Sequence, residues 1–107
     1  MEITIYQINS ANRNFLFSRW KDVKDEFSIN NYNNVWTGTE KDIYGEEVEI
    51  NTKSEITLLE HIFTKFNLNH PSNFHGHSLS VSDVVKIDEK YFYCDSFGWQ
   101  DVTSKIK

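Results

Sequence analysis

Two strand-like runs near the C-terminus are joined by only three polar residues, and this short connection constrains the fold more than any other feature. Residues 79–87 (LSVSDVVKI) begin with alternating apolar and polar side chains, and residues 91–95 (YFYCD) are rich in aromatic β-formers. The connection, residues 88–90 (DEK), is too short for the crossover that parallel strands require. The sequence therefore predicts an antiparallel hairpin.

The first third of the chain predicts a strand followed by a helix. In residues 2–8 (EITIYQI) apolar and polar side chains alternate, which favours a strand. In residues 12–27 apolar side chains recur at spacings of four, three and four, which predicts one face of an amphipathic helix. The Asn-rich residues 28–34 predict a loop. The apolar positions of the predicted helix are Leu16, Trp20, Val23 and Phe27.

The middle of the chain predicts a short strand at residues 35–39 and a second helix at residues 55–67. This helix has a capping-box pattern at its start and apolar side chains at helical spacing. Residues 40–54 fit either a hairpin around Gly45 or an irregular excursion. A last short element is expected at residues 99–102.

The element order is therefore β-α-β-α-β-β within a single domain, residues 1–107. Because the last two strands cannot be parallel, we expect an α+β fold. It would have a small mixed or mostly antiparallel sheet, with two helices packed on one face.

Charge and composition exclude several classes of partner. The formal net charge of −5 and a pI near 5.3 disfavour direct binding to nucleic acid, because the phosphates would be repelled. An acidic protein is better suited to a basic protein surface. The chain has one cysteine, Cys94, and no long apolar run or secretory leader. We therefore expect a cytoplasmic protein that does not bind membranes.

Signatures of catalysis and of cofactor binding are weak. His75 and His77 form a His-x-His pair that suits a metal ion in a strand, with Asp95 or His61 as a third ligand. No HExxH pattern accompanies them, so they remain weak candidates for a metal-dependent hydrolase. Cys94 lies next to Asp95, whose charge would raise the pKa of the thiol. A phosphate-binding glycine loop is absent, and we expect no cofactor and no enzymatic activity.

Residues 74–85 (FHGHSLSVSDVV) carry a more specific pattern. Together with residues 59–67 (LEHIFTKFN) and 91–99 (YFYCDSFGW), this segment resembles the YodL-like domain family, and ITIYQI and NNYNNVWTG fit its opening segments. Such domains occur in Gram-positive bacteria, often on conjugative elements and phages. The resemblance implies no established common enzymatic activity and supplies no catalytic residues.

The candidate binding residues follow from this pattern and from exposed aromatic or acidic positions. The side chains of Ser80, Ser82 and Asp83 would either contact a partner or satisfy backbone groups at a buried turn. An exposed tryptophan would be a binding hot spot, and the acidic excursion would carry target specificity. The further candidates are Trp36, Trp99, Glu46, Glu47 and Glu49.

The leading hypothesis is a non-enzymatic protein-binding module from a mobile element or phage. It would inhibit a host factor such as a defence nuclease, in the manner of an anti-CRISPR or anti-restriction protein, by covering a basic channel. The alternative partner is a bacterial cytoskeletal or cell-shape protein. The sequence leaves the identity of the partner and the oligomeric state open.

Overall fold

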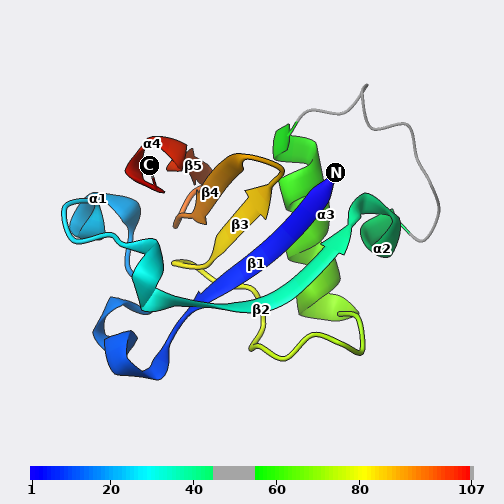
Figure 1. Ribbon diagram of the computed structural model, residues 1–107, viewed down its shortest axis with the longest axis horizontal. Coiled ribbons are helices and arrows are strands. Elements are labelled where there is room, and N and C mark those ends of the chain that lie inside the picture. The colour runs from blue at the N-terminus through cyan, green and yellow to red at the C-terminus, as the bar shows by residue number, and fades with distance from the viewer. Residues whose placement is uncertain (45–54, 107) are drawn as a thin grey trace.

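The computed structural model describes residues 1–44 and 55–106, and an antiparallel sheet forms its centre (Figure 1). Five strands of the described residues pair in the order β2-β1-β3-β4-β5, and each pairing is antiparallel. This confirms the predicted α+β class and the antiparallel sheet. The strands are β1 (Glu2–Ile8), β2 (Tyr32–Thr39), β3 (Val84–Ile87), β4 (Lys90–Cys94) and β5 (Trp99–Asp101).

One long helix and several short ones surround the sheet. The long helix, α3 (Glu55–Leu68), confirms the helix predicted over residues 55–67. Within the described parts of the chain, no helix is long and apolar enough to cross a bilayer. The short helices are η1 (Ser10–Phe15), α1 (Trp20–Val23), η2 (Ile29–Asn31), α2 (Glu40–Tyr44) and α4 (Thr103–Ile106).

The main core lies between α3 and one face of the sheet. In Figure 1, α3 crosses behind β1 and β2. Its apolar stripe is fully or almost fully buried against alternate side chains of the central strands. Each such side chain contributes about 1.5–3 kcal/mol relative to an exposed one. The stripe consists of Leu58, Leu59, Ile62 and Phe66, and the strands contribute Ile3, Ile5, Val85, Ile87 and Phe92.

A second, aromatic cluster lies on the opposite face of the sheet. Val84 and Tyr93 are neighbours of Val85 and Phe92, so they point away from α3. The ring of Trp20, in α1, lies 5.0 Å from the ring of Tyr93. The first helical segment therefore covers the face opposite α3. We expected both helices to pack on one face of the sheet, and this part of the prediction is wrong.

The predicted hairpin is present, but its first strand begins late. Val84 pairs with Tyr93 and Ile87 pairs with Lys90. Residues 79–83, expected to extend β3, instead form a turn. The Asp83 carboxylate accepts a hydrogen bond from the backbone N–H of Ser80 at 2.9 Å, which favours a turn over a strand.

The prediction of one continuous helix over residues 12–27 is wrong. The segment contains η1, a bend at Phe17 and one turn of α1. Phe17 adopts a left-handed φ of 62°, which a helix does not allow. Two distant side chains hold this bend, because the N–H groups of Phe17 and Trp20 donate to Ser82 Oγ and Asp95 Oδ1.

Other boundaries shift by a few residues. The whole predicted strand at residues 35–39 belongs to β2, which begins earlier, at Tyr32, within the predicted loop 28–34. The short element expected at residues 99–102 is β5, and α4 follows it. Residues 40–44 form α2, whereas the hairpin or excursion expected around Gly45 lies outside the described residues.

Candidate functional site

The turn between β4 and β5, residues 95–98, is fixed by its own hydrogen bonds. The N–H of Asp95 donates to the carbonyl oxygen of Gly98 at 3.0 Å, which closes the turn. Gly98 has a φ of 70°, in the region where a residue without Cβ is favoured. The Asp95 carboxylate also accepts the N–H of Ser96 at 2.8 Å. The 95–98 turn is therefore pre-organised rather than a free loop.

The same carboxylate joins the turn to α1. Asp95 Oδ1 accepts the backbone N–H of Trp20 at 3.1 Å, at the start of that helix. A carboxylate in this position satisfies an N–H group that has no partner within the helix. A further bond runs from the Tyr93 hydroxyl to the carbonyl oxygen of Ser18 at 2.6 Å. These bonds hold the segment before α1 against the end of β4.

Phe97 is displayed at the tip of this turn. Its side chain is 93% exposed, the highest value among the large exposed apolar residues of the described chain. At this exposure Phe97 contributes little buried apolar surface to the described chain. Such a side chain is suited to insertion into a partner, because rigid aromatic anchors lose little entropy on binding.

Two hollows flank the 95–98 turn. The hollow on the side of α3 has a volume of about 190 Å³, and the hollow on the side of α1 has a volume of about 510 Å³. Asp95 and Ser96 line both. The α3-side hollow is lined by Glu60, Phe63, Val81, Cys94, Gly98 and Trp99 as well, and the α1-side hollow by Arg19, Trp20, Lys21, Phe97 and Gln100.

Asp83 of the FHGHSLSVSDVV motif is a fully buried anchor of the chain. Its Oδ2 accepts hydrogen bonds from Ser80 N–H at 2.9 Å and from the Gln7 side-chain amide at 3.0 Å. Its Oδ1 accepts none from the residues that the structure describes. Burial raises the pKa of Asp83 to about 7, although the bond from Ser80, the nearby His77 and the bond from Gln7 each lower it.

Gln7 completes this buried connection between β1 and the motif. Its amide nitrogen donates to the carbonyl oxygen of His77 at 2.9 Å, and its oxygen accepts the N–H of His77 at 3.1 Å. Gly76 is required next to it, because a Cβ there would collide with the Gln7 side chain. Sequence reasoning missed Gln7, because a single polar residue in an apolar strand does not reveal its distant partners.

Ser82 is also fully buried, in a left-handed conformation with a φ of 87°. Its Oγ accepts the N–H of Phe17 at 3.1 Å, and its carbonyl oxygen accepts the Tyr32 hydroxyl at 2.7 Å. Ser80 is half-buried, and its hydroxyl donates to Ser78 at 2.9 Å. In this conformation Ser82 and Asp83 offer no surface to a partner, and their hydrogen bonds fit the structural interpretation of the motif.

The tryptophans predicted as hot spots differ in their surroundings. Trp36 is only 4% exposed, because its ring packs 4.9 Å from Phe66 and its N–H donates to Asn73. Trp36 therefore belongs to the core instead of an exposed surface. Trp99 is half-buried and lines the α3-side hollow, so it remains accessible. The acidic candidates Glu46, Glu47 and Glu49 lie outside the described residues.

The histidine pair does not form a metal site in the described chain. His75 and His77 are exposed and lie in a loop, so the strand that would align their rings is absent. His77 Nδ1 lies 2.7 Å from the carbonyl oxygen of Ser78, which requires a proton on that nitrogen. Residues 1–44 and 55–106 contain no group of three or more His, Cys, Asp or Glu side chains that could hold a metal.

Cys94 is buried at the end of β4, beside the α3-side hollow. Burial, with a smaller contribution from the carboxylates of Asp83, Glu60 and Asp95, raises the pKa of its thiol to about 12. The thiol is therefore protonated near neutral pH. A protonated thiol is a poor nucleophile and a poor metal ligand.

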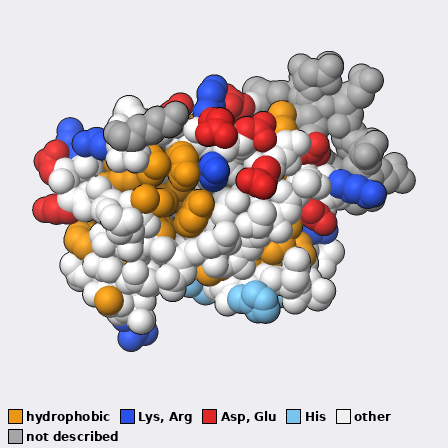
Figure 2. Space-filling model, viewed as in Figure 1, with side chains coloured by type: hydrophobic (Ala, Val, Ile, Leu, Met, Phe, Trp, Pro, Cys, Tyr) orange, Lys and Arg blue, Asp and Glu red, His pale blue; other side chains and the backbone are white. Residues whose placement is uncertain are grey.

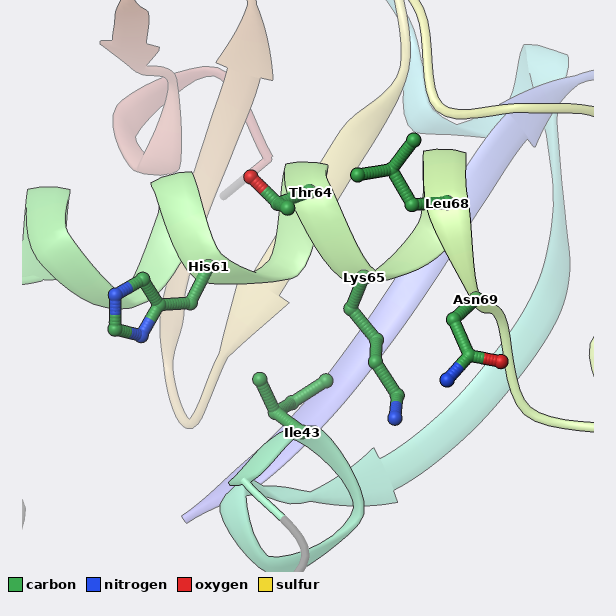
Figure 3. A pocket seen from close by; sticks show the side chains of 6 residues that line it. All are labelled: Ile43, His61, Thr64, Lys65, Leu68 and Asn69. Atoms are coloured by element: carbon green, nitrogen blue, oxygen red, sulfur yellow. The ribbon is translucent and has the colours of Figure 1, made fainter.

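A third hollow, of about 300 Å³, lies between α2 and the C-terminal half of α3. Figure 3 shows Ile43 of α2 facing the side chain of Lys65, with Asn69 beside it and Leu68 pointing away. Its lining has one amine and one imidazole but no carboxylate.

Phe97 and Phe17 are the surface features that sequence reasoning missed. Phe17 is 64% exposed at the bend before α1. Phe97 lies in the turn between β4 and β5, outside every element that the sequence predicts. A large aromatic residue next to glycine in a turn was the available signal, because turns favour small polar residues.

Comparison with known proteins identifies a family and nothing more specific. The family model of the YodL-like domain matches residues 2–104, nearly the whole chain. No curated protein matches the chain, and no solved structure matches it. The match includes the 95–98 turn and the buried motif around Asp83.

Proposed function

The chain belongs to the YodL-like domain family, and on this premise we propose that it is a non-enzymatic protein-binding module whose anchor is Phe97. The observation that carries the proposal is the 93% exposure of this phenylalanine on a turn fixed by Asp95 and Gly98. Burial of an aromatic side chain removes roughly 150–250 Å² of surface from water. Pre-organisation of the turn keeps the entropic cost of binding low.

The ionisable groups with strongly raised pKa values support a binding role over catalysis. Asp83 is fully buried and bonded to Gln7 and Ser80, so it faces no substrate-sized hollow. Cys94 lies beside a hollow, but a pKa of about 12 keeps its thiol protonated. A general base or nucleophile requires both access and a pKa near the working pH.

The target class that we propose is a host factor with a basic surface, such as a defence nuclease. The net charge of −5 supports this target class. Carboxylates near the β3–β4 turn support it as well: the N–H of Glu2 donates to Asp88 there, and Glu55 forms an ion pair with Lys90. Figure 2 shows acidic side chains gathered at this end of the molecule. Complementary charge would speed association with a nucleic-acid-binding enzyme. Inhibition of this kind would protect a phage or conjugative element from host defence.

The test is an affinity capture from a bacterial host lysate with wild type and two matched variants. Phe97→Ala removes the proposed anchor, and Leu68→Ala removes another apolar side chain that is 82% exposed, on α3. We expect Phe97→Ala to weaken capture of a stoichiometric partner at least tenfold, since loss of a hot-spot residue costs about 2 kcal/mol or more. Leu68→Ala should bind like wild type.

Equal capture by all three proteins would contradict the role of Phe97, and no capture by folded wild type would contradict the binding module. The target class is tested separately by a phage plaque assay in a host with an active defence nuclease. We expect expression of the chain to raise plaque numbers. Unchanged plaque numbers, or recovery of a cell-shape filament protein as the partner, would reject the nuclease as target.

A further inference from the structure

β5 leaves the backbone groups of two residues pointing away from the sheet. Val102 N–H donates to Tyr91 and Asp95 N–H donates to Gly98, so these pairs are the hydrogen-bonded pairs of the β4–β5 ladder. Since the pattern alternates, Trp99 and Asp101 form non-hydrogen-bonded pairs with β4. Their N–H and C=O groups therefore face outward, and no bond from them to another described residue is present.

The other edge of the sheet is partly covered. At β2, the N–H of His75 approaches the carbonyl oxygen of Val35 at 3.4 Å, so the loop after α3 lies along that edge. β5 is thus the edge with the freer backbone. A partner strand that pairs with Trp99 and Asp101 would gain up to about four main-chain hydrogen bonds, two for each outward-facing residue.

The two hollows beside the 95–98 turn lie on opposite faces of this edge. Trp99 lines the α3-side hollow and its neighbour Gln100 lines the α1-side hollow. Successive side chains of a paired strand also point to opposite faces. A strand added to β5 would therefore direct alternate side chains towards the two hollows.

The linings of the two hollows differ in chemistry. The α3-side hollow offers the apolar surfaces of Phe63, Val81 and Trp99, and the carboxylates of Glu60 and Asp95 in its lining disfavour an acidic side chain there. The α1-side hollow contains two cations, Arg19 and Lys21, and one carboxylate, Asp95, which accepts the N–H groups of Trp20 and Ser96. In the described chain Arg19 pairs with Asp22 at 2.9 Å, whereas Lys21 has no ion pair. The first hollow suits an aliphatic side chain and the second suits a carboxylate.

We propose that a segment of a partner protein adds a strand to the outer edge of β5. In this segment an apolar side chain alternates with acidic ones. The apolar side chain enters the α3-side hollow, and the acidic ones face Lys21 in the α1-side hollow. Phe97 contacts the partner next to this segment. The inference rests on the proposed binding function: the acidic segment lies at the Phe97 surface, whereas the basic surface of the same partner faces the carboxylates near the β3–β4 turn.

The test uses a capped seven-residue peptide with a central leucine, a glutamate on each side and threonine elsewhere. A matched peptide carries lysine in place of both glutamates. Titration followed by backbone amide NMR shifts measures affinity and location. We expect saturable binding with shifts at residues 99–101 and in both hollows, and at least tenfold weaker binding of the lysine peptide.

Two protein variants test the backbone and the charge. Asp101→Pro removes an outward N–H that β4 does not use, and Asp101→Ala is its control because both lose the carboxylate. We expect the proline variant to bind the glutamate peptide at least tenfold more weakly than the alanine variant. Lys21→Glu, at an exposed position, should lower the affinity for the glutamate peptide and raise the affinity for the lysine peptide.

Three results would overturn the inference: no saturable binding to wild type, shifts outside β5 and its hollows, or equal affinity of the two peptides. If Asp101→Pro does not fold, Lys21→Glu decides: unchanged preference of this variant for the glutamate peptide over the lysine peptide would overturn the inference. The two variants are also compared in the affinity capture. If Phe97→Ala loses the captured partner but folded Asp101→Pro still binds it, only the pairing at the β5 edge is overturned. Retention by both variants would overturn the proposed binding surface as well.

Discussion

At the scale of single residues, two buried polar side chains organise the motif that resembled a binding site. Asp83 and Ser82 are both fully buried, and each accepts hydrogen bonds from residues far away in the sequence. Replacing either side chain would leave donors without partners, which costs about 1–3 kcal/mol for each buried group. Their burial and hydrogen bonds support a role in folding.

The Asp83 carboxyl should make stability depend on pH. Its pKa rises from an ordinary value near 3.8 to about 7 in the folded state, so the folded protein binds a proton more tightly than the unfolded chain. The contribution of this group to stability is therefore full below about pH 4, falls as pH rises towards 7 and is constant above that. We expect this dependence to be lost in Asp83→Asn.

Urea unfolding of wild type and Asp83→Asn at about pH 4.5 and about pH 7.5 measures the effect. The variant should gain stability relative to wild type on going to the higher pH, by up to about 4 kcal/mol. Other carboxyl groups titrate equally in both proteins, so the difference between them isolates Asp83. An identical change in both proteins would show that Asp83 does not titrate in this range.

At the scale of secondary-structure elements, distant side chains decide where the first helical segment breaks. The apolar spacing in residues 12–27 fits a helix, and Trp20, Val23 and Phe27 do face the core as that spacing implies. Yet the bend at Phe17 places a bulky residue at a left-handed φ of 62°. This conformation costs about 1–2 kcal/mol, and the hydrogen bond to Ser82 offsets part of it.

Asp95 should be the residue that couples α1 to the 95–98 turn. Asp95→Ala removes the acceptor of the Trp20 and Ser96 N–H groups, so we expect a loss of about 1–2 kcal/mol in the free energy of unfolding. Hydrogen exchange at both amides should accelerate together. Asp95→Asn keeps an acceptor oxygen and should restore most of the protection. Fast exchange at Ser96 alone would show that the two elements are not coupled.

At the scale of the whole molecule, β4 lies between two cores. Phe92 packs towards α3 and Tyr93 towards α1, so the strand is enclosed on both faces. Cys94 follows on the same strand and is 4% exposed. The thiol is therefore shielded in the folded protein, although Cys94 lines the α3-side hollow.

Thiol labelling should report this shielding. We expect Cys94 to react with an aromatic disulfide reagent far more slowly than a free thiol near neutral pH, because burial raises its pKa to about 12. The rate should rise steeply with urea, in parallel with global unfolding. A control with Cys94→Ala and Ser96→Cys places the thiol on the exposed turn and should react at once. Fast labelling of native wild type would contradict the buried position.

Local patterns in the sequence determined much of the fold. The alternation in β1, the apolar stripe of α3 and the short connection between β3 and β4 predicted the α+β class and an antiparallel hairpin. These features depend on neighbours in the chain and on which face is buried, and both are visible as periodicity. The resemblance to the family likewise depended on local motifs.

The tertiary structure alone decided the bend at Phe17, the burial of Asp83 and the display of Phe97. The bend depends on a hydrogen bond to Ser82, 65 residues away, and the start of α1 depends on Asp95, 75 residues from Trp20. The amphipathic period of residues 12–27 is equally compatible with a helix and with the short segments observed. Only the assembled sheet brings these acceptors to the chain, because backbone groups choose between local and distant partners after the layers have formed.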